Sequence, residues 1–421
     1  MSRAYTNFKV HELKNEELAG MVRRLQNLTE DGYGAIKKNY ALFETSYKRI
    51  LPLSKQEKEW YLYFYTMYEL ISLYARHEKY DEVVKYAELF YKETALHMDR
   101  ELPNYPGTDM SFLNTWTYRD IFRAYYYYHQ IDDKKMEAFM EIYEAGAIKY
   151  GKTYTYYEDE MTLSVLYRDT ERAEKAARNF MLYEKGITGC YVCNCTPYLS
   201  CLLLLGQERQ AEELMLKFIY KKIPKRHLWC YKYCDNGNEM EMYSIVLFRC
   251  IWGGNEEAYR YFFDKYWKEL PVESHRKPTS GTIGRLLRAA AGVLNYIEDD
   301  LQLVEEDIND TDHYTTVGNM EYALMWWCYF TLLDRSGVRE VKIKLPGLNT
   351  PDVKTEEDIQ AADGEESMKG TENASKVSTL SVAEYMEKRA DEFGALFSKA
   401  RARFDYKGLK GTYGSCFLSE N

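Results

Sequence analysis

The sequence predicts an all-α protein, a right-handed α-solenoid built from helical hairpins. Three observations support this fold class. Apolar residues recur at helical spacing over most of residues 12–333, a short turn pattern is repeated, and the 421-residue chain contains only 9 prolines and 24 glycines. A single compact core stops growing well before this length, so a stack of repeats explains the size of the chain.

The helical spacing is clearest in two segments, 60–75 and 82–97, which a short polar turn separates. In the first segment, apolar residues recur at the i, i+4, i+7 spacing of one helix face: Trp60, Phe64, Met67, Tyr68, Ile71 and Tyr74. The second segment repeats the pattern with Val83, Ala87, Phe90 and Tyr91. We therefore expect a helix–turn–helix pair here.

The same pair is expected to recur, because its turn recurs. A small or polar residue is followed by acidic residues and then by a small residue that lets the second helix approach the first. The pattern occurs at 78–83 (EKYDEV), 168–173 (RDTERA), 206–211 (GQERQA) and 253–258 (GGNEEA), with a weaker copy at 131–136. Successive copies are roughly 37 to 53 residues apart, against about 34 in a regular tetratricopeptide repeat (TPR). The sequence therefore predicts degenerate TPR-like hairpins with loop insertions, each burying its apolar face against the next.

The organisation is expected to change after the solenoid, which we assign to residues 1–335. Residues 336–349 begin with a helix stop and then alternate apolar and charged residues, as a short C-terminal strand would. Residues 350–378 are acidic and poor in aromatic residues, which is typical of a flexible linker or insert. Residues 379–421 are predicted to form a capping helix over about 382–403 and a tail that turns on its glycines over 404–414.

Composition and charge exclude several classes of partner. The formal net charge is −10, so nucleic acid is not expected as a partner, and the only compact basic run, 221–226 (KKIPKR), is too short to line a groove. The amino-terminal residues show no signal-peptide pattern, and the most apolar stretch, 323–333, is shorter than the ~20 residues that cross a bilayer. Nine cysteines, an odd number, favour free thiols or metal ligands over a disulfide framework. We therefore expect a cytoplasmic protein with no membrane partner.

Residues 146–153 (GAIKYGKT) match the phosphate-binding pattern G-x-x-x-x-G-K-[ST]. That loop follows a buried strand, so that backbone N–H groups and a helix N-terminus meet the phosphates. Residues 134–145 instead have the apolar spacing of a helix. We therefore interpret the pattern as a helix C-terminus capped by Gly151, and we expect no nucleotide cofactor.

Several cysteines are grouped in one part of the sequence. Cys190 and Cys193 form a C-x-x-C motif, and Cys230 and Cys234 follow a predicted helical hairpin, one helical turn apart. Because this spacing suits a tetrahedral zinc site, these four are the candidate metal ligands, and a structural zinc would act there as a staple. The alternative is that they are buried thiols that pack as small apolar residues. Structural zinc is the only cofactor that the sequence suggests.

No pattern argues for catalysis, so we predict no catalytic residues. The histidines form no H-E-x-x-H or comparable motif, and the chain has no G-x-S-x-G or G-x-G-x-x-G pattern. Carboxylate pairs such as Glu158/Glu160 and Asp299/Asp300 lie in charged runs, which are typical of solvated helix faces.

Tyrosine is abundant, with 41 residues. Its ring buries a large apolar area, while its hydroxyl can bond to water or to a partner. The candidate partner-binding residues, on the concave surface of the solenoid, are Tyr125, Tyr128, Tyr154, Tyr156 and Tyr157. A core with polar edges is an equally suitable place for such side chains.

Residues 189–234 resemble a family of uncharacterised bacterial TPR-like repeat proteins with a Cys-x-x-Cys loop, found widely in Gram-positive organisms. The matching features are the C-x-x-C motif, a Leu-Gly-turn-Ala repeat at 205–211 and a further cysteine, Cys230. A basic segment ending in Leu-Pro at 341–346 and the pair Phe404-Asp405 extend the resemblance over more than half of the chain. Cys234 and the long acidic insert depart from the family pattern. The resemblance implies the helical repeat fold, and the family has no established enzymatic activity.

The function predicted from the sequence is that of a protein-binding adaptor or regulator. The concave surface of a helical solenoid would present aromatic and charged side chains to a helix or extended segment of a protein or peptide partner. One alternative is an immunity or antitoxin protein whose acidic surface neutralises a basic toxin. Another is an enzyme whose site assembles from scattered residues.

Overall fold

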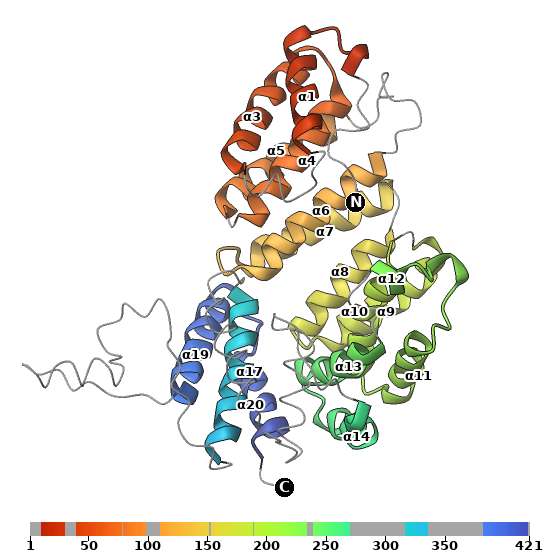
Figure 1. The fold of residues 1–421 in the computed structure, drawn as a ribbon, viewed down its shortest axis with the longest axis vertical. Coiled ribbons are helices and arrows are strands. Elements are labelled where there is room, and N and C mark those ends of the chain that lie inside the picture. Colours follow the sequence, from red (N-terminus) through yellow and green to blue (C-terminus); the bar gives the residue numbers. More distant parts are fainter. Residues whose placement is uncertain are drawn as a thin grey trace, which may run out of the picture. The chain divides into compact units, whose positions relative to one another are not determined.

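A computed structural model gives the fold of the chain (Figure 1). It describes residues 10–29, 39–77, 79–97, 110–150, 153–187, 189–233, 239–269, 316–335 and 382–419. Regular structure in these ranges is helical throughout and includes no strand, which confirms the predicted all-α class. The strand expected over 336–349 and the acidic segment expected over 350–378 lie outside the described residues.

The chain divides into two compact units, 1–126 with 130–159, and 127–129 with 160–421. The first unit contains η1 (Val10–Glu12), α1 (Glu16–Thr29), α3 (Tyr40–Gln56), α4 (Trp60–Arg76), α5 (Tyr80–His97), nearly all of α6 (Met110–Tyr127), α7 (Asp133–Tyr150) and the first half of α8 (Thr153–Leu166). Within it, α3 packs on α1 and on α4, and α4 packs on α5. The helix–turn–helix pair predicted over 60–97 is therefore confirmed as α4 and α5.

The second unit begins within α8. It contains α9 (Thr170–Tyr183), η2 (Glu184–Gly186), α10 (Tyr191–Leu204), α11 (Glu208–Ile219), η3 (Lys225–His227), α12 (Cys230–Tyr233), α13 (Glu239–Gly253), α14 (Glu256–Tyr266), η5 (Trp267–Glu269), α17 (Thr316–Arg335), α19 (Val382–Ala400) and α20 (Tyr406–Phe417). Here α10 packs on α9, α11 and α13, and α13 packs on α14.

Three pairs of consecutive helices in the second unit, α8–α9, α10–α11 and α13–α14, are joined by the same backbone turn. An amide donates to the carbonyl five residues before it, at 2.9, 2.8 and 2.9 Å in the pairs Asp169–Ser164, Gln207–Leu202 and Asn255–Cys250. The residue before each donor has a left-handed φ, of 51°, 66° and 67° at Arg168, Gly206 and Gly254. These are the features of a Schellman motif, which satisfies the last carbonyls of one helix and reverses the chain into the next. The turns predicted at 168–173, 206–211 and 253–258 are confirmed.

The small residue that closes each turn pattern is buried. Ala173, Ala211 and Ala258 are each 0% exposed. A small side chain at these positions lets the second helix of a hairpin lie close against the first. Gly253 is the small residue at the contact between two hairpins, since a Cβ there would lie 3.5 Å from the Cα of Leu204 on α10.

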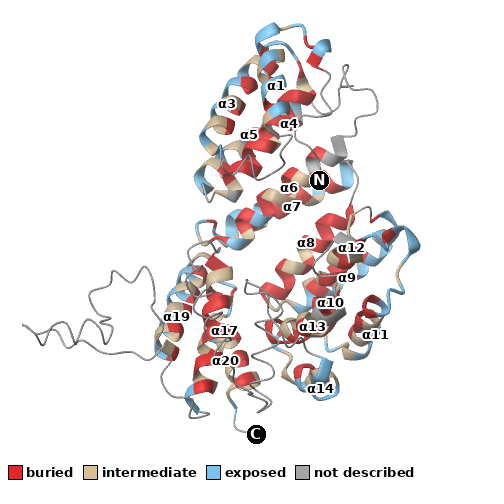
Figure 2. Cartoon of the chain, viewed as in Figure 1, coloured by how far each residue is buried: buried red, intermediate tan, exposed pale blue. Residues whose placement is uncertain are grey.

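Aromatic rings fill the core of the first unit, on the helix faces that Figure 2 shows as buried. The Tyr118 ring is stacked between those of Tyr91 and Tyr143, with centroids 5.6 and 5.1 Å away. Gly146 of α7 lies against this stack, because a Cβ at that position would be 2.7 Å from the Tyr118 ring. The first glycine of the phosphate-binding pattern is therefore a packing residue inside a helix. α7 continues to Tyr150, and residues 151–152 lie outside the described part.

The carboxyl-terminal helices belong to the second unit, where α17 and α19 lie side by side. The helix predicted over 382–403 is confirmed as α19. The expectation of a tail that turns on its glycines is wrong, because α20 is helical from Tyr406 to Phe417. Asp405 caps this helix by accepting from the Gly408 amide at 2.9 Å, and Leu409, Tyr413 and Phe417 bury one face. The apolar face and the cap outweigh the low helix propensity of the glycines.

Candidate functional site

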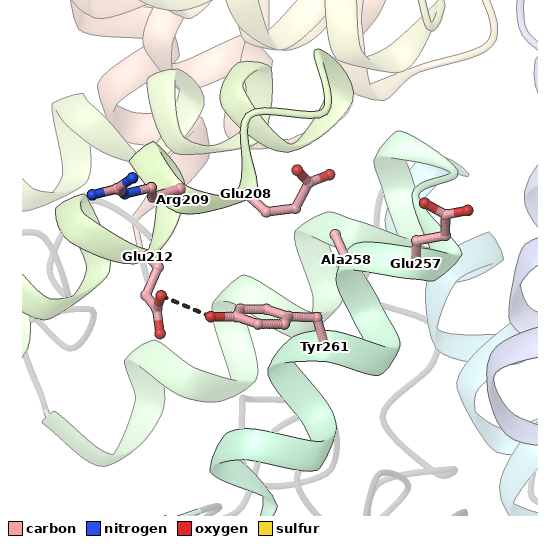
Figure 3. A pocket seen from close by; sticks show the side chains of 6 residues that line it. All are labelled: Glu208, Arg209, Glu212, Glu257, Ala258 and Tyr261. Atoms are coloured by element: carbon pink, nitrogen blue, oxygen red, sulfur yellow. Dashed lines mark hydrogen bonds between the residues drawn. The ribbon is translucent and has the colours of Figure 1, made fainter.

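An open groove lies between α11 and α14, the second helices of two neighbouring hairpins (Figure 3). Its volume is about 560 Å³. Three residues of α11 and three of α14 line it: Glu208, Arg209, Glu212, Glu257, Ala258 and Tyr261. Each of these helices begins directly after a Schellman turn, so the turns position both walls of the groove.

Glu212 ties the two walls together. Its carboxylate accepts a hydrogen bond from the Tyr261 hydroxyl at 3.0 Å (Figure 3). It also accepts from the Lys265 ammonium at 2.6 Å, which makes an ion pair, and from the Tyr266 hydroxyl. Partial burial opposes ionisation, but these three donors outweigh it and lower the pKa of Glu212. The carboxylate therefore stays charged at neutral pH.

Asn255 fixes one end of the groove. Its side-chain oxygen caps α14 by accepting from the Ala258 amide at 2.9 Å, while its side-chain nitrogen donates to the Leu203 carbonyl at 2.7 Å and to Glu208 at 2.9 Å. A single amide side chain thus joins the end of α10, the start of α11 and the start of α14. The spacing of the groove walls is set by these bonds.

The groove is acidic. Its lining residues include three carboxylates and one guanidinium. The Arg209 side chain is 91% exposed and lies 3.7 Å from Glu213, so a further carboxylate shares its charge. Tyr261 is 45% exposed and gives the groove an aromatic wall. Such a surface suits a cationic side chain whose apolar stem can lie on a ring.

The predicted zinc ligands lie elsewhere in the second unit, where α10 begins. Cys190 is the N-cap of α10, Cys193 is the third residue of the helix, and Cys230 begins α12. The amide of Tyr191, the residue after Cys190, donates to Cys230 Sγ at 3.3 Å. The structure therefore brings Cys230 to the C-x-x-C motif from 40 residues away. The pKa of Cys190 is raised, first by the contact with Cys193 and then by burial.

Cys234 lies outside the described residues, so the predicted set of four ligands is not complete in them. Among the residues that are described, no group of three or more His, Cys, Asp or Glu side chains is placed to hold a metal ion. A structural zinc on Cys190, Cys193, Cys230 and Cys234 stays a prediction. His227 is 2% exposed, and its ring lies 5.2 Å from that of Tyr191, in the first turn of α10.

The five tyrosines predicted to bind a partner are all buried, with exposed fractions of 4 to 9%: Tyr125, Tyr128, Tyr154, Tyr156 and Tyr157. The Tyr125 ring contacts Phe139 at 5.1 Å, and the Tyr156 ring contacts Tyr157 at 5.1 Å. Of the two environments considered, these rings occupy the polar-edged core. A role for them in partner binding stays a prediction.

The interpretation of Glu158 as part of a solvated face is wrong, because its exposed fraction is 4%. In the first unit its carboxylate lies 2.5 Å from the Arg119 guanidinium, which is also 3.6 Å from Asp159. The Tyr143 hydroxyl donates to Asp159 at 2.9 Å. Burial outweighs the attraction of Arg119 and raises the pKa of Glu158 to about 8. No local signal could reveal this cluster, because Arg119 is 39 residues away.

Among the helices of the described ranges, none combines the length and apolar composition that a bilayer crossing requires. Comparison with known proteins gives no further assignment of the site. No protein-family model, curated protein or solved structure matches the chain.

Proposed function

We propose that this chain is a protein-binding helical-repeat protein, an adaptor or regulator that holds a segment of another protein. The observation that carries the proposal is the acidic groove between α11 and α14, whose walls belong to two successive hairpins. Repeat proteins recognise partners on surfaces of this kind, because stacked hairpins give a continuous row of grooves. In this proposal the hairpins continue as degenerate TPR-like repeats in a right-handed solenoid.

The chemistry of the groove favours a basic partner segment. A lysine or arginine of the partner would place its charge between Glu208 and Glu257, while its stem lies on the Tyr261 ring. The net charge of −10 favours the same partner, because complementary charge speeds association. Glu212 is already bonded to three donors and serves to hold the walls.

The test is affinity capture of the tagged protein from its own cells, carried out in parallel with two charge-reversal variants. Glu257→Lys changes the groove, and Glu174→Lys is the matched control, since Glu174 is an exposed residue of α9 with a 64% exposed side chain. We expect the wild type and Glu174→Lys to capture one protein. The amount of this protein captured by Glu257→Lys should be lower by a factor of at least about ten. Binding should also weaken with added salt.

Equal capture by all three proteins would show that the groove is not the binding surface. Capture of no protein by the wild type would overturn the binding function itself. If the partner is a basic toxin, the role becomes that of an immunity protein, which the same groove chemistry would serve.

A further inference from the structure

The end of α11 and the segment that follows it form a strongly basic stretch of an otherwise acidic chain. Residues 214–234 contain six lysines and arginines and no aspartate or glutamate, although the formal net charge of the whole chain is −10. Five of the six are exposed: Lys217, Lys221, Lys222, Lys225 and Arg226. Exposed charges more than about 8 Å apart are largely screened at physiological salt, so a molecule close to this stretch meets its positive charge rather than the net charge of the chain.

A turn at the C-terminus of α11 folds this stretch back on the helix end. Lys221 has a left-handed φ of 54°, and the Lys222 amide donates to the Lys217 carbonyl at 2.8 Å, as in the Schellman turns described above. The Tyr231 hydroxyl donates to the Phe218 carbonyl at 2.7 Å, which holds α12 against the same helix end. The beginning and the end of residues 217–231 therefore lie together.

The lysines of this stretch are not neutralised as others in the second unit are. Lys265 and Lys410 each form an ion pair with a carboxylate. Within the described ranges, no carboxylate forms an ion pair with Lys222 or Lys225. The Lys222 ammonium lies over the Tyr220 ring, 5.5 Å from its centroid, so its charge stays at the surface beside an aromatic side chain.

Large apolar side chains are exposed beside these cations. Leu228 and Trp229 closely follow the basic run and are 42% and 44% exposed, and Tyr220 directly precedes the run and is 62% exposed. The Arg226 guanidinium donates to a carbonyl of η2 at 2.6 Å, which brings the end of α9, where Leu182 is 74% exposed, to the same region. We define the basic-apolar surface as Tyr220, Lys222, Lys225, Arg226, Leu228 and Trp229.

This combination of side chains suits the surface of an anionic lipid bilayer. Anionic headgroups attract lysine and arginine, with a gain of about fivefold in affinity for each cation near the surface. Tryptophan, tyrosine and leucine side chains are favoured at the boundary between headgroups and acyl chains. A bilayer receives exposed apolar side chains without a preformed pocket, whereas an acidic protein segment would have to bring a pocket for each of them.

We propose that the basic-apolar surface docks the chain on an anionic lipid bilayer, with Leu228 and Trp229 at the headgroup boundary and the cations among the lipid phosphates. This inference goes beyond the proposed protein-binding function, and it uses the C-terminal end of α11, whereas the groove is lined by residues 208–212 of that helix. The expectation of no membrane partner rested on the lack of a stretch long enough to span a bilayer, and docking of this kind requires none.

The test is co-sedimentation of the purified full-length chain with vesicles of phosphatidylcholine, either alone or mixed with phosphatidylglycerol. We expect binding to the mixed vesicles only, and we expect it to weaken as salt is added. Lys222→Glu combined with Lys225→Glu should lower the affinity by a factor of at least about ten, because two attractions are replaced by repulsions. Lys175→Glu combined with Lys388→Glu is the matched control, since it changes the net charge equally at exposed lysines of α9 and α19.

A second variant tests the apolar contacts. Trp229→Ala should lower the affinity for the mixed vesicles by a factor of at least about three, because less apolar area enters the headgroup boundary. Leu396→Ala is the control, since Leu396 lies on α19 and has the same exposed fraction, 44%, as Trp229. Circular dichroism and thermal unfolding show whether each variant is folded.

The proposal is wrong if the wild type does not sediment with the mixed vesicles, or if it binds equally to vesicles of phosphatidylcholine alone. It is also wrong if both double variants lose binding equally, because net charge would then be the cause. Displacement of the vesicles by soluble polyglutamate, together with wild-type affinity of Trp229→Ala, would identify the surface as a site for acidic protein segments and overturn the bilayer. The result of the groove experiment does not alter these outcomes, so the two proposals are tested separately.

Discussion

One guanidinium, that of Arg119, serves two buried carboxylates in the core of the first unit. Glu158 and Asp159 are adjacent in α8, and both lie within 4 Å of it. The second carboxylate gains less electrostatic stabilisation from the same cation than the first does, while each carboxylate loses its hydration on burial. Burial therefore raises the pKa of both groups. Removing Arg119 would leave both carboxylates without this cation and cost about 3–5 kcal/mol.

The pKa of Glu158 predicts a pH dependence of stability. The pKa is about 8 in the folded chain against an ordinary value of 4.5, so between these values the folded state binds more protons than the unfolded state. The free energy of unfolding should therefore fall as pH rises from about 4.5 to about 8. Glu158→Gln cannot ionise and should flatten this slope. Urea unfolding at pH 5.5 and pH 8 measures it, with Glu174→Gln as the exposed control; equal slopes in all three proteins would contradict the assignment.

Gly146→Ala gives a second prediction at this scale. Alanine in a helix interior is ordinarily favourable over glycine by about 1 kcal/mol. At position 146 the new Cβ would lie 2.7 Å from the Tyr118 ring, which two stacked neighbours hold in place. We expect a net loss of about 1–3 kcal/mol in the free energy of unfolding. Gly20→Ala, where nothing lies within 4 Å, is the control and should not destabilise α1.

At the scale of elements, the Schellman turns define where each helix ends and the next begins. Gly206 has a φ of 66°, and a Cβ there would meet only Glu208 Oε1 at an ordinary contact distance of 3.8 Å, so Gly206→Ala isolates the cost of the left-handed backbone. We expect a loss of about 1–2 kcal/mol in urea unfolding. Gly254→Ala should lose more, because its Cβ would also lie 2.9 Å from the Arg168 guanidinium. Gly206→Asn, which tolerates this backbone better, should recover part of the loss.

Asn255 joins two hairpins, so its replacement tests how the groove walls are held. Asn255→Ala removes the cap of α14 and two donated hydrogen bonds, and we expect a loss of about 2–3 kcal/mol in the free energy of unfolding. Asn255→Asp keeps the capping oxygen but loses both donors and places a charge beside Glu208. We therefore expect this variant to remain less stable than wild type, because the bonds that set the spacing of the groove walls are lost. Stability of Asn255→Asp equal to that of wild type would show that the cap alone matters.

At the scale of the whole molecule, the net charge predicts that the chain does not bind nucleic acid. With a formal net charge of −10, the chain repels phosphate backbones, and the short basic run at 221–226 offers few contacts to offset this. We expect no binding of double-stranded DNA at physiological salt in a fluorescence anisotropy titration. Saturable binding that weakens steeply with salt would contradict this expectation.

The helical class, the α4–α5 pair and the positions of the hairpin turns in the second unit could all be predicted from the amino-acid sequence. These features are local, because amphipathic spacing, a left-handed residue and a small closing residue all lie within a few positions of one another. The same local logic failed at α20, where the glycines suggested a turn and the cap at Asp405, together with a buried face, produced a helix.

Which side chains meet became clear from the tertiary structure alone. It placed Glu158 beside Arg119, Cys230 beside Tyr191, and Glu212 of α11 beside Tyr261 of α14, in pairs that are about 40 to 50 residues apart in the chain. It also buried the five tyrosines that the sequence allowed either in a core or on a surface. A residue's spacing fixes the helix face on which it lies, but its environment depends on which distant helix covers that face, and no local pattern specifies that pairing.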